Sequence, residues 1–257
     1  MNPDSKLIKI PSNKVKEYHK YFDEYRYARR FIDQMKTYPS ANLWVDQEKE
    51  PTLLFFQMPW INIPAGDHTS PKVDAILDKV GTALVFYPNP EWKKVIQERF
   101  GGILEEFTHR TYKSEKLDHN HARKFIRPLP EGYYLERINQ ETAQYIDENL
   151  HAFSMTWETV ENYVNKGLGY CIRFDDKVVS HAGSIFPFTK HLEIQVDTDP
   201  EYRGNGYATV VCAKLIEQCL LNDIIPYWEA HTEISAKIAE KLGFNDPQLY
   251  DLFMKIE

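Results

Sequence analysis

The chain has 257 residues, of which 42% are hydrophobic and 27% are charged, and its net charge at pH 7 is −7. This length suits one large domain or two of ordinary size, and the composition is that of a globular protein with a substantial core. The negative charge argues against general attraction to nucleic acid or anionic membranes. No apolar run reaches the length of a membrane span or a signal peptide, and the three cysteines form no C-x-x-C pair. We therefore expect a cytoplasmic protein with no metal site and no disulfide framework.

In the first half of the chain, predicted helices and strands alternate. The hydrophobic pattern predicts a helix over 15–38, a buried strand over 52–58 and a loop over 59–71. The predictions that follow are a helix over 72–80, a strand over 82–87, a helix over 90–100 and a strand over 105–113. The polar, proline-containing stretch 114–132 is the expected linker, so the predicted domains are 1–128 and 129–257.

The second half also mixes both kinds of element. The pattern predicts a strand over 133–138, one or two helices within 140–166, and a hairpin over 169–186 that turns at Asp175 and Asp176. A strand over 191–198 leads into a glycine-containing loop and an amphipathic helix from Tyr207 onward. A strand over 225–231, a helix over 233–242 and a strand over 249–256 complete the chain. The predicted fold class is α/β with a mixed sheet.

The two halves show a faint similarity at a shift of 142 positions. This shift aligns Glu98–Gly101 with Glu240–Gly243 without a gap and places Phe86 on Trp228. Both halves would then end in the order strand, helix, glycine turn, strand. A tandem repeat and a chance similarity are both open at this point.

The stretch Asp199–Ala208, which reads DPEYRGNGYA, stands between a predicted strand and a predicted helix. The first N–H groups of a helix have no intrahelical partners, and the macrodipole gives this end partial positive charge. Glycine lets such amides approach a phosphate without an intervening Cβ. The stretch therefore predicts a pyrophosphate cradle, with Arg203 adding a charge-assisted hydrogen bond. The alternative is a tight turn with a solvated arginine.

These residues resemble a known family. Pro200–Ala208 is similar to the acyl-CoA pyrophosphate loop of the GNAT superfamily of N-acetyltransferases, because Arg203, Gly206 and Ala208 match its Gln/Arg-x-x-Gly-x-Gly/Ala signature. Glu240–Phe244 reads EKLGF, a familiar ending of the family's last helix. The resemblance covers 133–257, and the two-part bacterial subgroup that includes zwittermicin-resistance acetyltransferases is the most similar. It implies a GNAT-like fold in the C-terminal half and raises the question of a degenerate GNAT-like repeat in the N-terminal half.

The resemblance also implies a reaction and its cosubstrate. Acetyl-CoA would donate the acetyl group, and the amine of a small molecule would attack the thioester directly. One strand would contact the pantetheine arm through its backbone, and the loop would hold the pyrophosphate. His231 stands where the family often has asparagine. The residues implied in acetyl-CoA binding are Val196, Asp197, Thr198, Arg203, Gly204, Asn205, Gly206, Tyr207, Ala208, His231 and Ser235.

A carboxylate on the same strand is the expected general base. Glu193 is the first candidate and Asp197 the second; the alternative for Glu193 is an exposed carboxylate without a catalytic role. Many relatives have a tyrosine as general acid in the last helix, but Ala239 directly precedes EKLGF here. A thiol with a pKa of about 8.5 can leave without a donor. Replacements for the missing acid would be Tyr207, Tyr250 or His231.

The acceptor side is less sharply defined. Trp157 and Glu158 are the expected acceptor-site residues, with Glu158 attracting a protonated amine, and packing in the core is the alternative for Trp157. A non-catalytic acyl-CoA-binding or regulatory module is the rival function. A small-molecule amine is the expected partner, nucleic acid and membranes are not, and a homodimer is left open.

Overall fold

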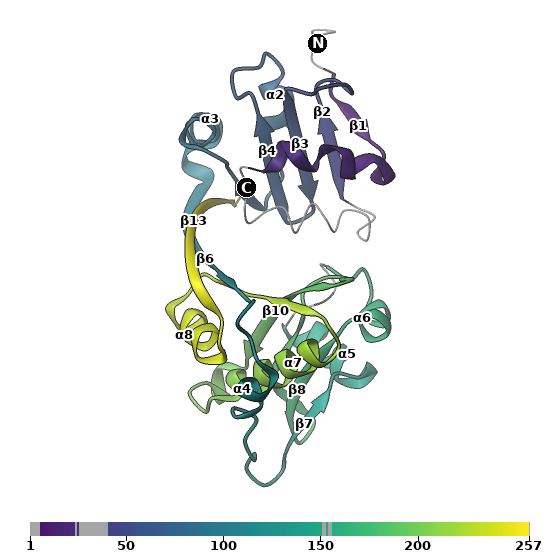
Figure 1. Cartoon of the computed structure of the whole chain (residues 1–257), viewed down its shortest axis with the longest axis vertical. Coiled ribbons are helices and arrows are strands. Elements are labelled where there is room, and N and C mark those ends of the chain that lie inside the picture. Colours follow the sequence, from purple (N-terminus) through teal and green to yellow (C-terminus); the bar gives the residue numbers. More distant parts are fainter. Residues whose placement is uncertain (1–5, 24, 26–40, 151–152, 154–155, 257) are drawn as a thin grey trace. The chain divides into compact units, whose positions relative to one another are not determined.

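The computed structural model describes residues 6–23, 25, 41–150, 153 and 156–256 (Figure 1). The chain forms two compact units. Unit 1 is Met1–His109 together with Tyr250–Glu257, and unit 2 is Arg110–Leu249. Each unit combines β-strands with helices in a mixed arrangement, as the α/β prediction requires.

Unit 1 is built on strands β1 to β5, with β6 beginning and β13 ending in this unit. Neighbouring strands from β1 to β4 run antiparallel, β4 and β5 run parallel, and β5 pairs antiparallel with β13. Its core gathers Leu53, Phe55, Val85, Trp92 and Phe253. The elements are β1 (Ile8–Ile10), η2 (Ser12–Phe22), β2 (Asn42–Val45), β3 (Leu53–Met58), β4 (Ile61–Gly66), α2 (Val73–Leu77), β5 (Leu84–Phe86), α3 (Pro90–Phe100), η4 (Gly101–Ile103) and β6 (Leu104–Lys113).

Unit 2 is built on a five-stranded sheet in the order β11-β10-β9-β8-β7. All pairs are antiparallel except β10 with β11, which is parallel. The elements are α4 (His119–Arg123), β7 (Tyr133–Arg137), α5 (Gln140–Leu150), α6 (Val160–Lys166), β8 (Gly169–Phe174), β9 (Lys177–Ser184), β10 (His191–Thr198), η5 (Pro200–Tyr202), α7 (Tyr207–Leu221), β11 (Ile225–Tyr227), β12 (Glu229–Ala230), α8 (Glu233–Leu242) and β13 (Asn245–Lys255).

Helices cover both faces of this sheet. Helix α7 packs against β8, β9 and β10, and its apolar residues share a core with Ile172, Leu192 and Ile194. Helices α5 and α6 cover the opposite face, where Ile146 and Tyr163 pack with Cys171. The sequence pattern predicts one apolar stripe on α7, but the helix is buried on further sides as well, because α4 also packs on it.

The element order supports the similarity between the halves. The shift of 142 positions carries α3 onto α8, β6 onto β13, and β5 to within one residue of β11. In both units a parallel pair also follows an antiparallel one: β4 with β5, and β10 with β11. The halves are therefore alike in the order and pairing of their last elements. A common origin of the halves stays a prediction.

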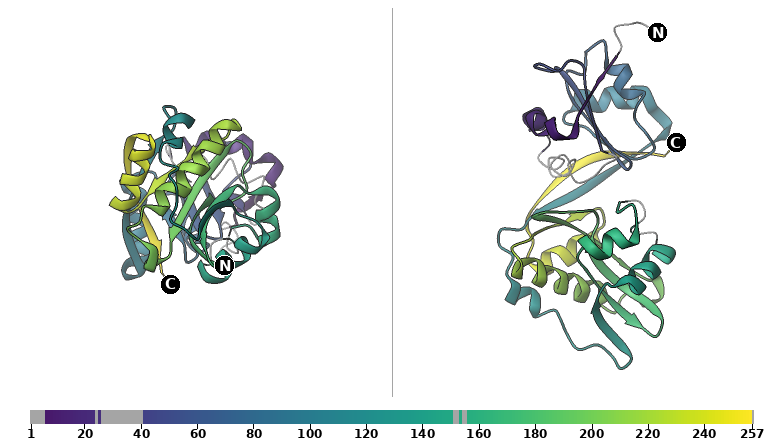
Figure 2. Two further views of the ribbon diagram at one scale, coloured as in Figure 1. Left: turned by 90° about the horizontal axis from the view of Figure 1, so that it is seen from below. Right: turned by 90° about the vertical axis from the view of Figure 1, so that its right-hand side faces the viewer.

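The last strands of the two halves are exchanged. Strand β6 comes from the first half, and its residues Arg110 and Thr111 pair with β12 in unit 2. Strand β13 comes from the second half, and its residues Leu252–Met254 pair with β5 in unit 1. Figure 2 shows β13 in yellow beside β6 in teal, as their neighbouring places in the strand order require. Each unit therefore contains a strand from the other half of the sequence.

The compact units do not divide at the predicted boundary of 128/129. The stretch 114–132, which we expect to be a linker, contains α4, and the side chain of Ala122 in this helix is fully buried. Arg123 donates a hydrogen bond of 2.5 Å to the buried carboxylate of Glu217 on α7. The pKa of Glu217 falls to about 2, because hydrogen bonds from Lys214 and Arg123 outweigh the opposing effect of burial. These contacts make the stretch part of unit 2.

Two further predictions need correction. The loop over 59–71 contains strand β4, whose Pro64 lies opposite Phe55 of β3 and obscures the strand pattern. The helix over 15–38 is replaced, as far as the structure describes it, by the 3-10 helix Ser12–Phe22. Residues 24 and 26–40 of this prediction lie outside the described residues.

The strand exchange makes a prediction about stability. Phe253 is 2% exposed in the core of unit 1, whereas Leu249 on the same strand is 63% exposed. We expect Phe253→Ala to lower the free energy of unfolding by about 3–5 kcal/mol, and Leu249→Ala to change it little. Hydrogen exchange should show the loss of protection in β5, the partner of β13. Unchanged protection of β5 would contradict the exchange.

Candidate active site

Strands β10 and β11 begin as neighbours and then separate. Three register pairs join them: His191 with Ile225, Leu192 with Pro226, and Glu193 with Tyr227. Beyond this point the chain of β11 continues into β12, which pairs with β6 instead. No strand of the described chain pairs with β10 on this side after Glu193. The result is a wedge whose closed end lies at Glu193 and whose open end lies at Thr198.

The hydrogen-bonding pattern decides which residues face the wedge. The N–H of Ile185 donates to the carbonyl of Glu193, and the N–H of Asp199 donates to the carbonyl of Val179, so the odd-numbered residues of β10 bond to β9. The backbone of Val196 therefore faces the wedge, whereas that of Asp197 faces β9. Thr198 also faces the wedge, but its N–H donates to the carboxylate of Asp197 (2.7 Å) and its carbonyl accepts from Arg203 Nε (3.0 Å).

The loop after β10 ends in an uncapped helix start. Gly204 and Gly206 have φ angles of 81° and 75°, which other residues adopt only with strain. Gly206 is the N-cap of α7 and has no side chain to cap it, and the first intrahelical bond runs from the N–H of Val210 to the carbonyl of Gly206. The N–H groups of the first turn, from Tyr207 to Thr209, are thus directed at any ligand there. This geometry suits an anion.

Two arginines hold this loop. Besides its bond to Thr198, Arg203 places Nη2 at 3.7 Å from the Asp197 carboxylate, and its side chain is 62% exposed. Arg127 donates a hydrogen bond to the carbonyl of Asn205, and its guanidinium lies beside Gly206. In the sequence, Arg127 is only one of three basic residues with Arg123 and Lys124, and nothing there predicts its contact with the loop. Both side chains add positive charge beside the helix start.

Other expected contacts lie farther along the chain. His231 is exposed and directly follows β12, after β11 has left β10. The hydroxyl of Ser235 accepts a hydrogen bond from Trp228 Nε1 at 3.0 Å. Thr232 caps the start of α8 by accepting a bond from the N–H of Ser235. Ser235 is thus engaged in holding α8 against Trp228, and its contact with acetyl-CoA stays a prediction.

Three polar side chains lie on the α5/α6 side of β10. Glu193, Gln195 and Asp197 alternate with residues that face α7, so they share one face. Glu193 is 7% exposed, and the side chain of Asp197 is 45% exposed. Glu193 is thus not an exposed carboxylate, as our alternative had it, and its catalytic role stays a prediction. A strand rises about 3.3 Å per residue, so the Cα atoms of Glu193 and Asp197 are about 13 Å apart.

Buried polar atoms gather on the same face. His181 lies opposite Asp197 on β9 and is 1% exposed, and neither of its ring nitrogens has a hydrogen-bond partner among the described residues. The amide oxygen of Gln195 and the hydroxyls of Thr156 and Tyr163 are also buried and have no hydrogen-bond partner in the part of the chain that the structure describes. The hydroxyl of Tyr163 lies over Gly183, the residue opposite Gln195, at a place where a Cβ would be 2.3 Å away. Buried polar atoms normally bind protein, water or ligand, so this surface suits a polar molecule.

Of the two residues expected to line the acceptor site, Trp157 is buried and Glu158 is exposed. Trp157 is 1% exposed, its Nε1 donates to the carbonyl of Ser184 at 3.0 Å, and its ring packs edge-on against Tyr163. It is therefore a core residue, as the alternative interpretation holds. Glu158 is exposed at a φ of 61°, in the turn before α6.

The residue that stands in place of the general acid, Ala239, is fully buried in the core of unit 2. Two of its candidate replacements are tyrosines. The ring of Tyr207 is 5% exposed and packs against Tyr133, and burial raises its pKa. Tyr250 belongs to unit 1. A role of Tyr207, Tyr250 or His231 as general acid stays a prediction.

Comparison with known proteins decides the family. The family model described as GNAT acetyltransferase matches residues 24–253, which is most of the chain. This chain belongs to the GNAT acetyltransferase family. An uncharacterized N-acetyltransferase of Bacillus subtilis (strain 168), YdfB, is 31% identical over 128 residues, which are 49% of this chain and 49% of that protein. The chain thus matches about half the length of this curated relative.

Solved structures agree with the GNAT fold. A GCN5-related N-acetyltransferase-like protein from Streptococcus suis 89/1591 superposes with a TM-score of 0.81 at 24% identity, covering 95% of this chain and 98% of that one. A tandem GNAT protein from the clavulanic acid biosynthesis pathway gives a TM-score of 0.58 at 12% identity and covers 96% of each chain. These likenesses extend over both units of this GNAT chain.

The described residues contain neither a membrane-spanning helix nor a metal cluster. None of the described helices is both long and apolar enough to cross a membrane. Among the same residues, no three histidine, cysteine or acidic side chains lie close enough together to hold a metal ion.

His181 makes the stability of this protein depend on pH. Burial lowers its pKa from 6.5 to about 4, although Asp197 opposes the shift. The folded state therefore keeps the ring neutral while the unfolded state binds a proton. This proton uptake does not affect stability above pH 6.5. As the pH falls from 6.5 to about 4, it lowers the free energy of unfolding by an amount that reaches about 3 kcal/mol.

We expect His181→Leu to remove this part of the pH dependence and to leave stability at pH 7.5 unchanged or raised, because a buried group without partners disappears. The exposed His119 provides the control, as His119→Gln should keep the dependence. Urea unfolding at pH 7.5 and 4.5 measures the difference. The same loss of stability in wild type and His181→Leu would refute the assignment.

Proposed function

We propose that unit 2 transfers the acetyl group of acetyl-CoA to the amine of a small molecule by direct attack on the thioester. One observation carries the proposal: the open backbone of Val196 leads along β10 into the uncapped start of α7. An edge of unpaired strand groups followed by a set of free helix N–H groups fits a ligand with an amide-containing arm and a phosphate end.

Acetyl-CoA has these two features. Its pyrophosphate would bind the N–H groups that follow Gly206, with Arg203 and Arg127 supplying positive charge. Its pantetheine amides would pair with the backbone of Val196, much as an added strand pairs with a sheet edge. The bound cosubstrate supplies an activated acyl group. The backbone of Asp197 faces β9, so Asp197 would contact the cosubstrate through its side chain. This carboxylate also accepts a hydrogen bond from the N–H of Thr198.

The direction of the strand separates the roles of the two carboxylates. The phosphates would lie at the Thr198 end of β10, so the thioester would point toward the closed end of the wedge, where Glu193 lies. With about 13 Å between their Cα atoms, Glu193 and Asp197 cannot both reach one reacting nitrogen. Asp197 stays near Arg203, at the phosphate end. The geometry thus favours Glu193 as the general base.

The proposed reaction begins with the loss of a proton. Glu193 would accept it from the ammonium group of the acceptor, directly or through water. The amine nitrogen would then form a bond to the thioester carbonyl carbon while a backbone N–H on the open side of β10 donates to the carbonyl oxygen. The C–S bond then breaks, the sulfur leaves as a thiolate with the electron pair, and the second proton of the attacking nitrogen passes to that thiolate, directly or through water, to give the amide and the free thiol of CoA. A thiol with a pKa of about 8.5 leaves without a side-chain acid, which is compatible with a buried Ala239.

The acceptor would lie over the face that holds His181 and Gln195. Their partnerless buried atoms support this placement, because a polar amine could satisfy them. The identity of the amine, a homodimer, a cytoplasmic location and membership of the zwittermicin-resistance subgroup stay predictions. Contacts of Ser235, His231 and Glu158 with either substrate also belong to this proposal.

Cosubstrate binding tests the loop. We expect acetyl-CoA to bind the wild-type protein in calorimetric titration, and Arg203→Glu to weaken binding at least about tenfold, because it places a negative charge beside the phosphates. Arg99→Glu is the control, since Arg99 pairs with Asp78 in unit 1. Equal affinity of wild type and Arg203→Glu would contradict the phosphate site.

Turnover tests the base. We expect Glu193→Gln to lower the rate of thiol release from acetyl-CoA in the presence of small primary amines by about 10²–10⁴, while acetyl-CoA affinity changes little. Glu201→Gln, an exposed residue of η5, should behave like wild type. A rate that survives in Glu193→Gln would exclude this base. Acetyl-CoA binding without turnover of any amine by the wild-type protein would favour the non-catalytic module.

A further inference from the structure

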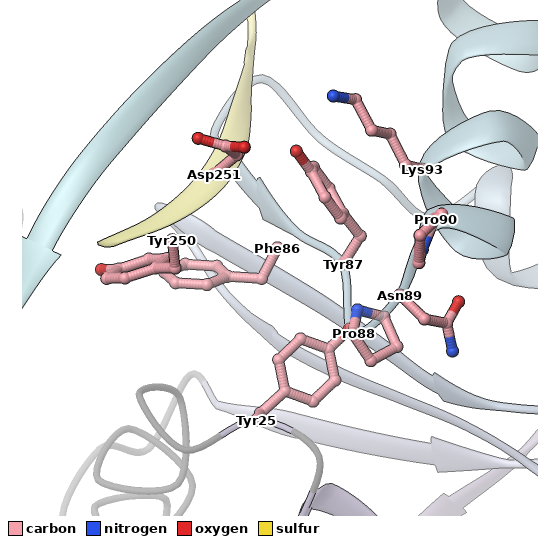
Figure 3. A pocket seen from close by; sticks show the side chains of 9 residues that line it. All are labelled: Tyr25, Phe86, Tyr87, Pro88, Asn89, Pro90, Lys93, Tyr250 and Asp251. Atoms are coloured by element: carbon pink, nitrogen blue, oxygen red, sulfur yellow. The ribbon is translucent and has the colours of Figure 1, made fainter. Parts of the chain in front are cut away.

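A pocket of about 430 Å³ lies in unit 1, where β5 ends and α3 begins (Figure 3). Its volume is within the range of small-molecule sites. Its aromatic and charged lining consists of Phe86, Tyr87 and Lys93, together with Tyr250 and Asp251 from the exchanged strand β13. The strand exchange thus completes the pocket.

One end of the pocket is aromatic. The rings of Phe86 and Tyr250 are stacked, with centroids 5.9 Å apart and an interplanar angle of 19°. Tyr25 adds a third ring, whose hydroxyl is tied to the carbonyl of Pro64, and Tyr87 stands between these rings and the polar end (Figure 3). Such walls favour a flat ring or a cation placed over an aromatic face.

The other end is polar, and its charges are unequally compensated. Lys93 forms an ion pair with Glu106, and Glu106 also accepts a hydrogen bond of 3.1 Å from the Tyr87 hydroxyl. Asp251 accepts a hydrogen bond of 2.6 Å from the neutral hydroxyl of Thr108, and no ion pair joins it to any described residue. Burial, followed by the carboxylates of Glu106 and Asp251, raises the pKa of Tyr87, so this hydroxyl stays neutral. The excess charge at this end is one negative carboxylate.

The similarity between the two halves relates residues of this pocket to residues of unit 2. The shift of 142 positions puts Asn89 of its rim on His231 and Lys93 on Ser235 of unit 2. A phosphate-bearing ligand does not fit here, however. Strand β4 is followed by Asp67 and by helix α2, which has five residues, in place of a glycine loop and the 15 residues of α7. At the place that corresponds under this shift, unit 1 thus has an aromatic pocket with a carboxylate and no glycine loop at a long helix.

We propose that this pocket binds a protonated amine that carries an aromatic ring, with the ring among Phe86, Tyr87 and Tyr250 and the ammonium group at Asp251. The ring matches the aromatic end, and the ammonium group compensates Asp251, which has no ionic partner among the described residues. A carboxylate ligand would be repelled, and a neutral ligand would leave the charge of Asp251 without a counterion. This site belongs to unit 1, and the proposal does not depend on the function proposed for unit 2.

The test uses three probes of matched shape: 2-phenylethylamine, 2-phenylethanol and 3-phenylpropionate, titrated into the full chain by calorimetry. We expect the amine to bind about two- to fivefold more tightly than the alcohol, the size of one exposed ion pair. Asp251→Asn should remove this advantage, and Asp74→Asn on the exposed side of α2 should keep it. Lys93→Met should strengthen amine binding, because it leaves the charge of Glu106 uncompensated.

Several outcomes would overturn the proposal. One is equal binding of amine and alcohol, another is amine binding that Asp251→Asn leaves unchanged, and a third is no binding of the amine. Preferred binding of phenylpropionate that is lost in Lys93→Met would assign an anion site instead. Amine binding that is lost in Glu193→Gln but kept in Asp251→Asn would place the amine in unit 2. We also expect Asp251→Asn to bind acetyl-CoA with the affinity of the wild type. This titration distinguishes a failure of the amine-site proposal from a failure of the proposed transferase function.

Discussion

The early end of the pairing between β10 and β11 is the constraint on which the site depends. Backbone N–H and C=O groups in a folded protein need partners. Strand β11 meets this need by continuing into β12, which pairs with β6, whereas β10 keeps only β9 beyond Glu193. Val196 is left with its backbone facing the wedge. The N–H groups at the start of α7 are open for a different reason, which is that Gly206 has no side chain to cap them. Two sets of unsatisfied backbone groups therefore lie along β10 and just beyond its end, and one elongated ligand can satisfy both.

The exchanged strands tie this local feature to the whole chain. Strand β6, which gives β12 its partner, belongs to the first half of the sequence, and β13 belongs to the second half yet completes unit 1. Neither half therefore contains all the strands of its own unit. Contacts of this kind join residues far apart in sequence, and such contacts form late because a long loop must close first. A cut between the predicted domains 1–128 and 129–257 would remove β6 from unit 2 and β13 from unit 1 together.

The sequence is informative where local chemistry decides the structure. Strand 191–198, helix 233–242 and the glycine loop are predicted correctly, because alternation, capping by Thr232 and the positive φ of Gly206 all have signals within a few residues. Register between strands has no such signal. The position of His181 opposite Asp197, the burial of Trp157 and the place of Arg127 beside Asn205 all depend on which segments meet in space. The same limit explains the domain boundary: α4 reads as a polar linker because its contact with α7 depends on Arg123 and a buried Glu217 distant in sequence.

Charge at the open end of the wedge shows why Arg203 matters to more than one group. Asp197 brings a negative charge to the end of β10 where the phosphates would bind, and that charge alone would oppose an anion. Arg203 lies between the two: its Nε holds the carbonyl of Thr198, and its Nη2 is 3.7 Å from Asp197. A guanidinium has five N–H groups in a planar fork, so the groups not used for Thr198 and Asp197 are still available to a phosphate. Lysine, with one compact ammonium group, could not bridge a carbonyl, a carboxylate and a phosphate in this arrangement. The arginine at this position thus compensates a carboxylate of the protein and keeps donors for the ligand.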